Sequence, residues 1–347
     1  MSRDKFLIVK GVAGLGNRML VALTGILYAR LSDRRLIVDW SDSTYSNNGF
    51  NAFPQFFLCE SSGSMDEIPA TGTVCPSVWQ NRLNESVATM RRDHNSIKEF
   101  RQKTSIDLRR LDYDEDILVM WSYHEHVNLL RSHFKGSYDE LIQMSKEEIL
   151  RMLLREDLLL QPRIHNMVTN LKNKKFRGKT VGVHIRYSDY RASLFPILDK
   201  LNTLLKHETN LQIFLATDNI QIKKMFEENY PGVITTPHWY PGPGSRIHDN
   251  RNCPDPMTSG VESLIDLYLL AECDYLIIDS SSSFSYITSF LTNTDASKIF
   301  DVSKGRKVPS ILRRFSWRVM LMLGLYSWGL NLLSKIVRTY NKLFRRT

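Results

Sequence analysis

The chain has 347 residues, enough for two domains of ordinary size, and its composition is that of a globular protein, with 42% hydrophobic and 24% charged residues. Its four cysteines include no closely spaced pair, which disfavours a zinc knuckle or a disulfide framework and favours a reducing compartment. Of the formal net charge of +9, eleven positive charges lie after residue 303, so residues 1–303 carry about −2. The basic balance therefore belongs to the tail and does not indicate a nucleic-acid-binding domain.

The first 40 residues predict a strand–loop–helix–strand unit. Residues 1–10 run into the strand-like segment KFLIVK without the apolar core of a secretory signal, so we expect a cytoplasmic protein. A glycine-rich turn follows at 11–18, then a helix over 19–32 and a strand over 35–40. This order is typical of an α/β fold with a parallel sheet.

The middle of the chain is less regular. Residues 60–115 are polar and predict loops with short helices, and 117–122 predict another strand. A helix is expected over 146–157, capped by Ser145 with Glu148 three residues later.

The second half alternates strands and helices more clearly. Its strands are continuous apolar runs, as expected where helices cover both faces of a sheet. The predicted strands are 180–185, 211–216 and 275–279, and the predicted helices are 196–207, 220–228 and 259–271, with a long loop over 237–256. We place a boundary near residues 160–175. The expected fold is two doubly wound, Rossmann-like domains facing a cleft, 1–165 and 166–310.

The glycine-rich turn has two interpretations as an enzyme site. In a dinucleotide-binding domain its glycines approach a pyrophosphate, and Asp39 at the end of the second strand binds ribose. The spacing here, however, is GxxGxG and not GxGxxG, and Asn17 and Arg18 follow Gly14 and Gly16. The chain also has no Tyr-x-x-x-Lys pair, which disfavours a short-chain oxidoreductase or epimerase.

Polar residues follow three predicted strands of the second half. Arg186 follows the first, flanked by His184, Tyr187 and Asp189, and offers a forked donor for a diphosphate. Asp218 follows the next strand. A serine turn follows the last, before a helix, where small hydroxyl residues form an anion site; it contains Ser281, Ser282 and Ser283. Because the carboxyl ends of parallel strands bind ligands, the sequence predicts a phosphate-binding site here.

These motifs resemble the fucosyltransferase superfamily, and within it the nodulation fucosyltransferases of the NodZ type (glycosyltransferase family 23). The resemblance rests on the GLGNR turn at 14–18, RLIVDWSDSTY at 35–45, NAFPQFF at 51–57, GVHIR at 182–186 and ESLIDLYLLAEC at 262–273. It implies a metal-independent GT-B-type fold and transfer of fucose from GDP-fucose, with inversion, in α-1,6 linkage to an N-acetylglucosamine-containing glycan or glycolipid.

The resemblance also implies roles for single residues. Arg186 matches the arginine that grips the donor diphosphate, and Asp218 and Asp266 match acidic residues of the donor site. Ser281, Ser282 and Ser283 match the phosphate-side turn, and His248 sits where a histidine lies in the related loop. The basic residue that often follows the motif arginine is replaced by Tyr187, and a lysine of some relatives by Tyr190. For the general base that inversion requires, we expect Asp189.

Two metal-binding interpretations are weak. Asp112 and Asp114 form an Asp-x-Asp pair, but it precedes a strand, where an acidic turn is the more common explanation. His124 and His126 are two residues apart and have no third ligand nearby in the sequence. We therefore expect no metal site.

The C-terminal residues, 311–347, predict a basic amphipathic helix. Polar residues recur there at steps of three and four, opposite an apolar face. The uninterrupted apolar run at 319–326 is too short to span a membrane, which needs about 20 residues. We expect this tail to lie on an anionic membrane surface, with docking on the protein's own body as the alternative.

Three functions remain open at this point: a GDP-fucose-dependent transferase, a nucleotide-dependent oxidoreductase or epimerase, and a non-catalytic glycan-binding protein of the same fold. The transferase is favoured because the strand-end motifs match it.

Overall fold

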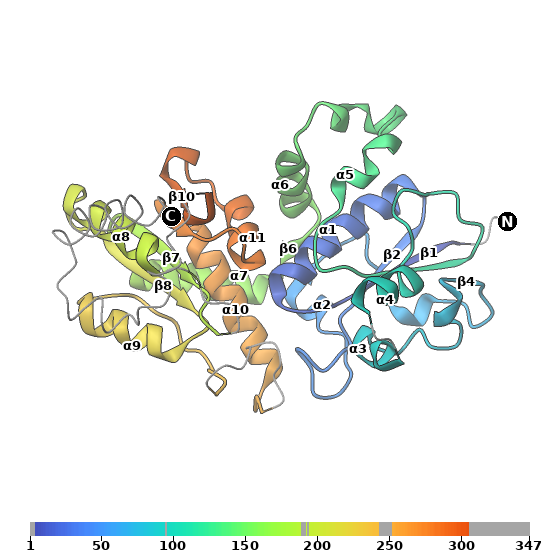
Figure 1. The fold of residues 1–347 in the computed structure, drawn as a ribbon, viewed down its shortest axis with the longest axis horizontal. Helices are drawn as coiled ribbons and strands as arrows, with labels where there is room; N and C mark the ends of the chain where they lie inside the picture. The colour runs from blue at the N-terminus through green and yellow to red at the C-terminus, as the bar shows by residue number, and fades with distance from the viewer. Residues whose placement is uncertain (1–3, 94–95, 189–191, 193, 243–251, 305–347) are drawn as a thin grey trace, which may run out of the picture.

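The computed structural model describes residues 4–93, 96–188, 192, 194–242 and 252–304, which contain two parallel sheets side by side (Figure 1). In the N-terminal sheet the strand order is β2-β1-β5-β4, and every pairing is parallel. Its strands are β1 (Phe6–Lys10), β2 (Arg35–Asp39), β4 (Val74–Cys75) and β5 (Ile117–Met120). Helix α1 (Leu15–Leu31) connects β1 to β2.

Short elements fill the rest of the N-terminal half, as the polar composition of residues 60–115 predicts. The helices are α2 (Phe53–Phe56), α3 (Val87–Met90), α4 (Ile97–Thr104), α5 (Val127–Leu130) and α6 (Lys146–Glu156). Strands β3 (Phe57–Leu58) and β6 (Leu159–Leu160) pair antiparallel. The predicted capping box of α6 is confirmed: Ser145 accepts from the backbone of Glu148, whose side chain accepts from Ser145.

The C-terminal sheet has the order β10-β9-β7-β8 and is also parallel throughout. Its strands are β7 (Thr180–Ile185), β8 (Gln212–Thr217), β9 (Tyr275–Ile278) and β10 (Ile299–Asp301). The helices of this half are α7 (Pro162–Lys175), α8 (Leu194–His207), α9 (Ile220–Asn229), α10 (Pro256–Ala271) and α11 (Ser283–Leu291).

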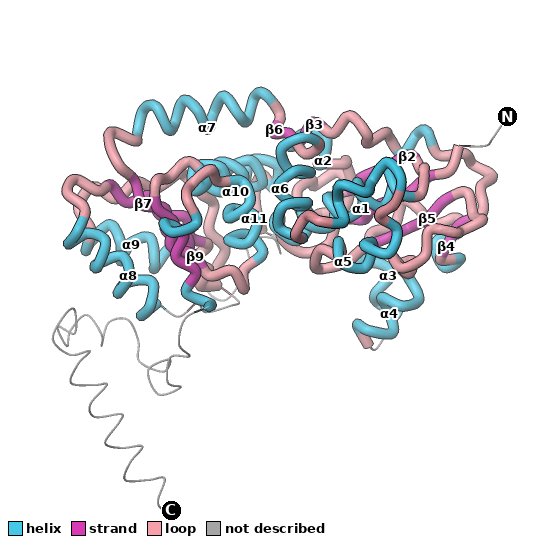
Figure 2. The backbone as a smooth tube through the Cα atoms, turned by 90° about the horizontal axis from the view of Figure 1, so that it is seen from above, coloured by secondary structure: helices cyan, strands magenta, loops and turns pink. Residues whose placement is uncertain are grey.

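Helices from both halves share one apolar core between the sheets. Helices α1 and α6 pack against α11, and α10 packs against α11 and α7. Buried side chains from these elements belong to one continuous cluster, for example Leu20, Leu150, Leu267 and Ile287. Helix α7, which covers the predicted boundary, leads from β6 to the C-terminal sheet along one side of the molecule (Figure 2).

The α/β class with parallel sheets is confirmed, and two predicted helix starts are wrong by three or more residues. Helix α1 begins at Leu15, inside the glycine-rich turn, and not at residue 19. Helix α10 begins at Pro256, where Asp255 caps it, and not at residue 259. In the ranges described above, no helix has both the length and the apolar character needed to cross a membrane. The tail, 311–347, lies outside the described residues.

Candidate functional site

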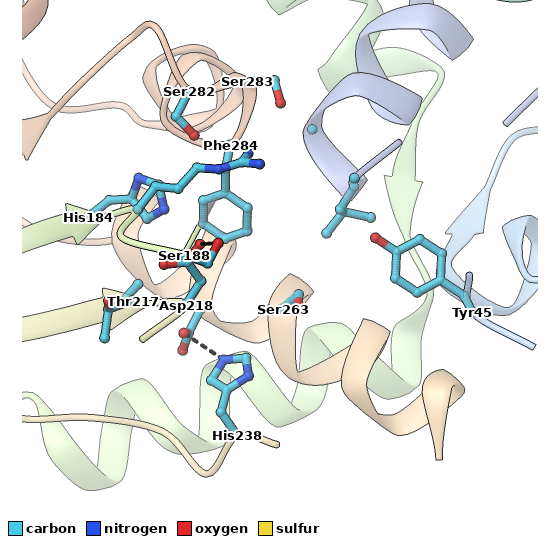
Figure 3. A pocket seen from close by; sticks show the side chains of 16 residues that line it. Tyr45, His184, Ser188, Thr217, Asp218, His238, Ser263, Ser282, Ser283 and Phe284 are labelled. Carbon is cyan, nitrogen blue, oxygen red and sulfur yellow. Dashed lines mark hydrogen bonds and ion pairs between the residues drawn. The ribbon is translucent and has the colours of Figure 1, made fainter. Parts of the chain in front are cut away.

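The predicted strand ends meet at one pocket of the C-terminal sheet (Figure 3). Strands β7 and β8 run in parallel, with His184 beside Ala216 and Ile185 beside Thr217, so the residues that follow both strands lie at one edge. The N-terminal half closes the pocket with its glycine-rich turn and Tyr45. The pocket is lined by Gly14, Leu15, Gly16, Tyr45, His184, Arg186, Ser188, Ala216, Thr217, Asp218, His238, Ser263, Asp266, Ser282, Ser283 and Phe284.

His184, the penultimate residue of β7, is a neutral, buried ring. Its Nδ1 is 2.6 Å from the hydroxyl of Ser285, and the ring stacks on Phe284 with 4.8 Å between centroids. Burial, aided by the nearby charge of Arg186, lowers the pKa of His184 to about 3. The imidazole therefore stays uncharged at neutral pH and fixes the first turn of α11 against the sheet.

Asp218, which follows β8, holds the segment after Arg186. Its carboxylate accepts bonds from the backbone N–H of Tyr187 at 2.6 Å and from the hydroxyl of Ser188 at 2.5 Å. The side chain of Asn219 donates to the carbonyl of Tyr187 at 3.2 Å. The acidic residue thus orders the loop in which Arg186 stands, and Tyr187 contributes its backbone to this network.

The serine turn places the N-terminus of α11 at the pocket. Ser282 is the N-cap residue, but its side chain makes no capping bond. Its hydroxyl is buried, lines the pocket and has no hydrogen-bond partner among the described residues. Ser281 instead donates to Asp279, and Ser283 donates to Asn17 of the N-terminal half at 2.9 Å. A helix N-terminus with an unpartnered buried hydroxyl suits an anionic group.

The glycine-rich turn contributes backbone to the pocket and a contact between the halves. A Cβ at Gly16 would lie 2.5 Å from the carbonyl carbon of Ser283 and 2.7 Å from the backbone nitrogen of Phe284, so only glycine allows this approach. Asn17 accepts from Ser283 and donates to the carbonyl of Tyr123 at 2.6 Å. The two halves are therefore fastened together directly beside the serine turn.

Arg18 differs from its predicted position in a ligand-binding loop. The side chain is buried behind the turn and donates to Asp42 at 2.6 Å, to Thr44 at 2.8 Å and to the carbonyl of Ala13 at 2.8 Å. Its guanidinium also lies over the ring of Tyr45, 5.3 Å from the centroid. In this structure Arg18 braces both the loop after β2 and the glycine-rich turn, and it does not itself line the pocket.

A further group of the pocket, His238 with Asp266, was not predicted as a pair. Asp266 on α10 accepts from Thr236 and lies 2.7 Å from Nε2 of His238. The missed signal is an alternation: Ile234 bridges to Phe214 of β8, and Thr236 and His238 follow at steps of two, on the same side of an extended segment. Of the other predicted residues, Asp189 and His248 lie outside the described residues.

The residues of the alternative dinucleotide and metal sites make ordinary structural contacts. Asp39, the residue a dinucleotide ribose would need, is buried in an ion pair with Lys10 at 2.5 Å. Asp112 pairs with Arg110 at 3.2 Å on the surface before β5, and His126 is 2.7 Å from the hydroxyl of Ser122. The described part of the chain contains no group of three His, Cys, Asp or Glu side chains placed to hold a metal ion.

Comparison with known proteins gives the family of this chain. The family model of nodulation protein Z (NodZ) matches residues 3–314. Nodulation protein Z of Azorhizobium caulinodans is 26% identical over 317 residues, covering 85% of this chain and 90% of that protein. The corresponding protein of Bradyrhizobium diazoefficiens is 22% identical over 311 residues, covering 80% and 76%.

Solved structures agree in fold. The crystal structure of selenomethionine fucosyltransferase NodZ from Bradyrhizobium matches with a TM-score of 0.59 at 22% identity, covering 86% of this chain and 97% of that one. NodZ α-1,6-fucosyltransferase soaked with GDP-fucose matches with a TM-score of 0.57 at 22% identity, covering 84% and 93%. A mutant of Arabidopsis thaliana FUT1 in complex with GDP matches with a TM-score of 0.52 at 15% identity, covering 84% and 70%. By the extent of the family match, this chain belongs to the nodulation protein Z (NodZ) family.

Proposed function

We propose that the protein is an inverting glycosyltransferase that transfers fucose from GDP-fucose, in α-1,6 linkage, to an acceptor containing N-acetylglucosamine. One observation carries the proposal: Arg186 and the N-terminus of α11 line the same pocket as Asp218 and Asp266. Membership of the NodZ family supports the same donor, because structures of a NodZ α-1,6-fucosyltransferase have been solved after soaking with GDP-fucose and after co-crystallisation with GDP.

The phosphate end of the pocket is formed by Arg186, Ser282 and Ser283. A diphosphate there meets a guanidinium fork, the unpartnered hydroxyl of Ser282 and the positive end of a helix. When the bond between the sugar carbon and the phosphate oxygen breaks, negative charge develops on the departing GDP. Preorganised donors stabilise that charge without needing to rearrange, and this is the main catalytic contribution that we assign to Arg186.

The base end of the pocket is formed by Asp266, with His238 beside it. A carboxylate only accepts hydrogen bonds, so it suits the N–H groups on the edge of guanine. The acceptor hydroxyl attacks the sugar carbon from the face opposite the leaving diphosphate, which inverts the configuration, and it must lose a proton to a base. Asp189, three residues after Arg186 in the sequence, is the residue that we propose for that step.

We further propose that the two sheets belong to two domains of a GT-B-type transferase, 1–165 on the acceptor side and 166–310 on the nucleotide-sugar side. The donor residues named above lie after residue 166, whereas the glycine-rich turn and Tyr45 of the first half close the pocket from the opposite side.

The test is a transfer assay with a chosen donor and a panel of acceptors. The purified chain is incubated with GDP-fucose and chito-oligosaccharides, and products are read by mass spectrometry; GDP-mannose and UDP-N-acetylglucosamine serve as control donors. We expect a mass increase of one deoxyhexose with GDP-fucose. Binding of GDP without transfer to any acceptor would instead support a glycan-binding protein, and binding of NAD without GDP would support an oxidoreductase.

For the tail, 311–347, we propose that a basic amphipathic helix holds the enzyme peripherally on the cytoplasmic membrane face. The support is the sequence: it has eight Lys and Arg, no acidic residue and an apolar face. Each charge contributes about 1 kcal/mol near an anionic surface, before screening by salt. Flotation with anionic and with neutral vesicles tests this. Full-length protein should float with anionic vesicles at low salt, and a chain ending at residue 310 should not.

A further inference from the structure

His238 is buried between two carboxylates that come from the same helix. Its side chain is 4% exposed; Nε2 lies 2.7 Å from Asp266, and Nδ1 lies 3.7 Å from Glu262. The backbone N–H of Trp239 donates to the same Glu262 oxygen at 3.2 Å, which holds that carboxylate beside the ring. Nδ1 is buried and has no hydrogen-bond partner among the described residues. Both His238 and Asp266 line the pocket.

The geometry decides which protons His238 carries. Because a carboxylate only accepts, Nε2 must be the donor toward Asp266. In the neutral ring Nδ1 would then point a lone pair toward the carboxylate of Glu262, whereas in the charged ring it presents an N–H. The charged ring therefore fits both neighbours, and the neutral ring fits only one.

The surrounding charges agree with this assignment. Burial lowers the pKa of His238, but Asp266 and Glu262 outweigh it, so the pKa is raised above the usual 6.5. Lys223 on α9 opposes this modestly; its ammonium lies 5.9 Å from the ring centroid of Tyr240, which packs against His238. The pKa of the Tyr240 hydroxyl is itself raised, by burial and then by Asp266, so that group stays neutral at physiological pH.

We infer that His238 is a positioning residue for donor recognition: as an imidazolium held between Asp266 and Glu262, it fixes the Asp266 carboxylate in the orientation that accepts from the guanine base. One oxygen of the Asp266 carboxylate accepts a hydrogen bond from Thr236, and the other accepts one from His238. Each oxygen keeps a further lone pair for a ligand. The inference rests on the proposed function, because it needs GDP as the ligand of this pocket. It adds that donor affinity depends on the protonation of His238.

The test compares wild type with His238→Gln and His238→Ala by calorimetric titration with GDP, from about pH 6 to about pH 9. The amide nitrogen of glutamine can replace the Nε2 donor to Asp266 but carries no titratable proton. At the lowest pH we expect alanine to weaken GDP binding roughly ten- to a hundredfold, and glutamine to recover most of this loss. In steady-state kinetics, His238→Ala should raise the KM for GDP-fucose and leave kcat little changed, since His238 does not touch the reacting carbon.

The pH dependence separates positioning from simple packing. The phosphates of GDP also titrate, but they do so equally for every variant, so the difference between wild type and His238→Gln is the readout. Wild-type affinity should fall relative to the glutamine variant as the pH rises through the raised pKa of His238. Equal GDP affinity of wild type and alanine variant, or an unchanged pH profile in His238→Gln, overturns the inference while leaving the proposed function intact. Failure of the wild type to bind GDP at any pH overturns both.

Discussion

The two ends of the pocket each contain a buried histidine, and the two rings have opposite electrostatic states. At the phosphate end, His184 contacts the ring of Phe284 and a hydroxyl, and burial lowers its pKa to about 3. At the base end, His238 contacts two carboxylates, which raise its pKa despite burial. Burial disfavours the charged form at both sites, so the partners decide the outcome.

This difference separates two tasks within one site. Under the proposed function the phosphate end must attract a dianion, and because His184 is neutral, Arg186 and the N-terminus of α11 are the groups that would supply the positive charge. Under the same proposal the base end must present the Asp266 carboxylate in a fixed orientation, which a charged His238 beside it would provide. We therefore expect substitutions at the phosphate end to change catalysis and substitutions at the base end to change affinity.

The largest expected effect is at the phosphate end, in Arg186→Lys. Lysine keeps the charge but loses the bidentate fork. A lost hydrogen bond to a charged group is worth about 1.5–3 kcal/mol, so kcat/KM for the donor should fall roughly ten- to a hundredfold. Steady-state kinetics measure the loss, and an unchanged melting temperature shows that the fold survives. A variant with wild-type kcat/KM would remove Arg186 from the leaving-group site.

Gly16→Ala tests whether the contact between the two halves stabilises the protein and supports the phosphate end of the pocket. The new methyl group meets the backbone of Ser283 and Phe284, which cannot rotate away as a side chain would. We expect about 1–3 kcal/mol of destabilisation, measured by denaturant unfolding, together with weaker GDP binding. Gly178→Ala is the matched control, because the nearest atom to its Cβ is 3.9 Å away. Equal stability of the two variants would contradict the close contact.

The pH dependence of stability should distinguish the two histidines. The folded-state pKa of His184, about 3, lies below its unfolded value, so on acidification below about pH 6.5 the unfolded chain takes a proton that the folded chain refuses. This site destabilises the fold by at most about 1.4 kcal/mol per pH unit as the pH falls. His184→Asn can keep the bond to Ser285 while removing the titration, and should flatten the acid side of the stability curve.

His238 should act on the other side of the curve. Its folded-state pKa lies above the unfolded value, so its contribution is complete at low pH and is lost as the pH rises through the raised pKa. His238→Gln should therefore flatten the alkaline side and leave the acid side unchanged. Unfolding midpoints measured across the pH range check both variants, and identical curves for the two would contradict the assignment of opposite states.

The smallest expected effect is that of chelation. Arg186 and the N-terminus of α11 can neutralise the leaving diphosphate, so activity should survive dialysis against EDTA. Loss of activity that manganese or magnesium restores would contradict this expectation and would indicate a metal site at Asp112 and Asp114, before β5.

The sequence predicted the parts of this site that depend on local order, and it missed those that depend on tertiary contacts. Arg186, Asp218 and the serine turn were predicted because strand ends are visible as the last residue of an apolar run. Because glycine is a poor helix residue, the sequence predicts a start of α1 that is too late, and the need for Gly16 arises only from the approach of Ser283.

Arg18 and His238 are two charged examples of features that the sequence does not predict, because their partners lie far away in the sequence. Arg18 can be buried because it donates to Asp42 and Thr44, which belong to the loop after β2. The sequence of the glycine-rich turn does not predict these partners. His238 lies 28 residues before Asp266, on an extended segment that joins the sheet through one bridge. Its contact with Asp266 forms because α10 packs against β8, and this tertiary contact is not encoded in the local sequence.

The contact between Gly16 and the serine turn constrains how the sequence of this chain can evolve. Residues 166–310 contain the arginine, both acidic residues and the serines of the pocket, but Ser283 is held by Asn17 and lies against Gly16 of the other half. Under the proposed function, donor recognition therefore depends on both halves, and a chimaera in which either half comes from a distant homologue should fold but lose activity. Position 16 must remain glycine whatever side chains occupy positions 283 and 284, because it meets their backbone, whereas Asn17 and Ser283, joined through their side chains, can change only together.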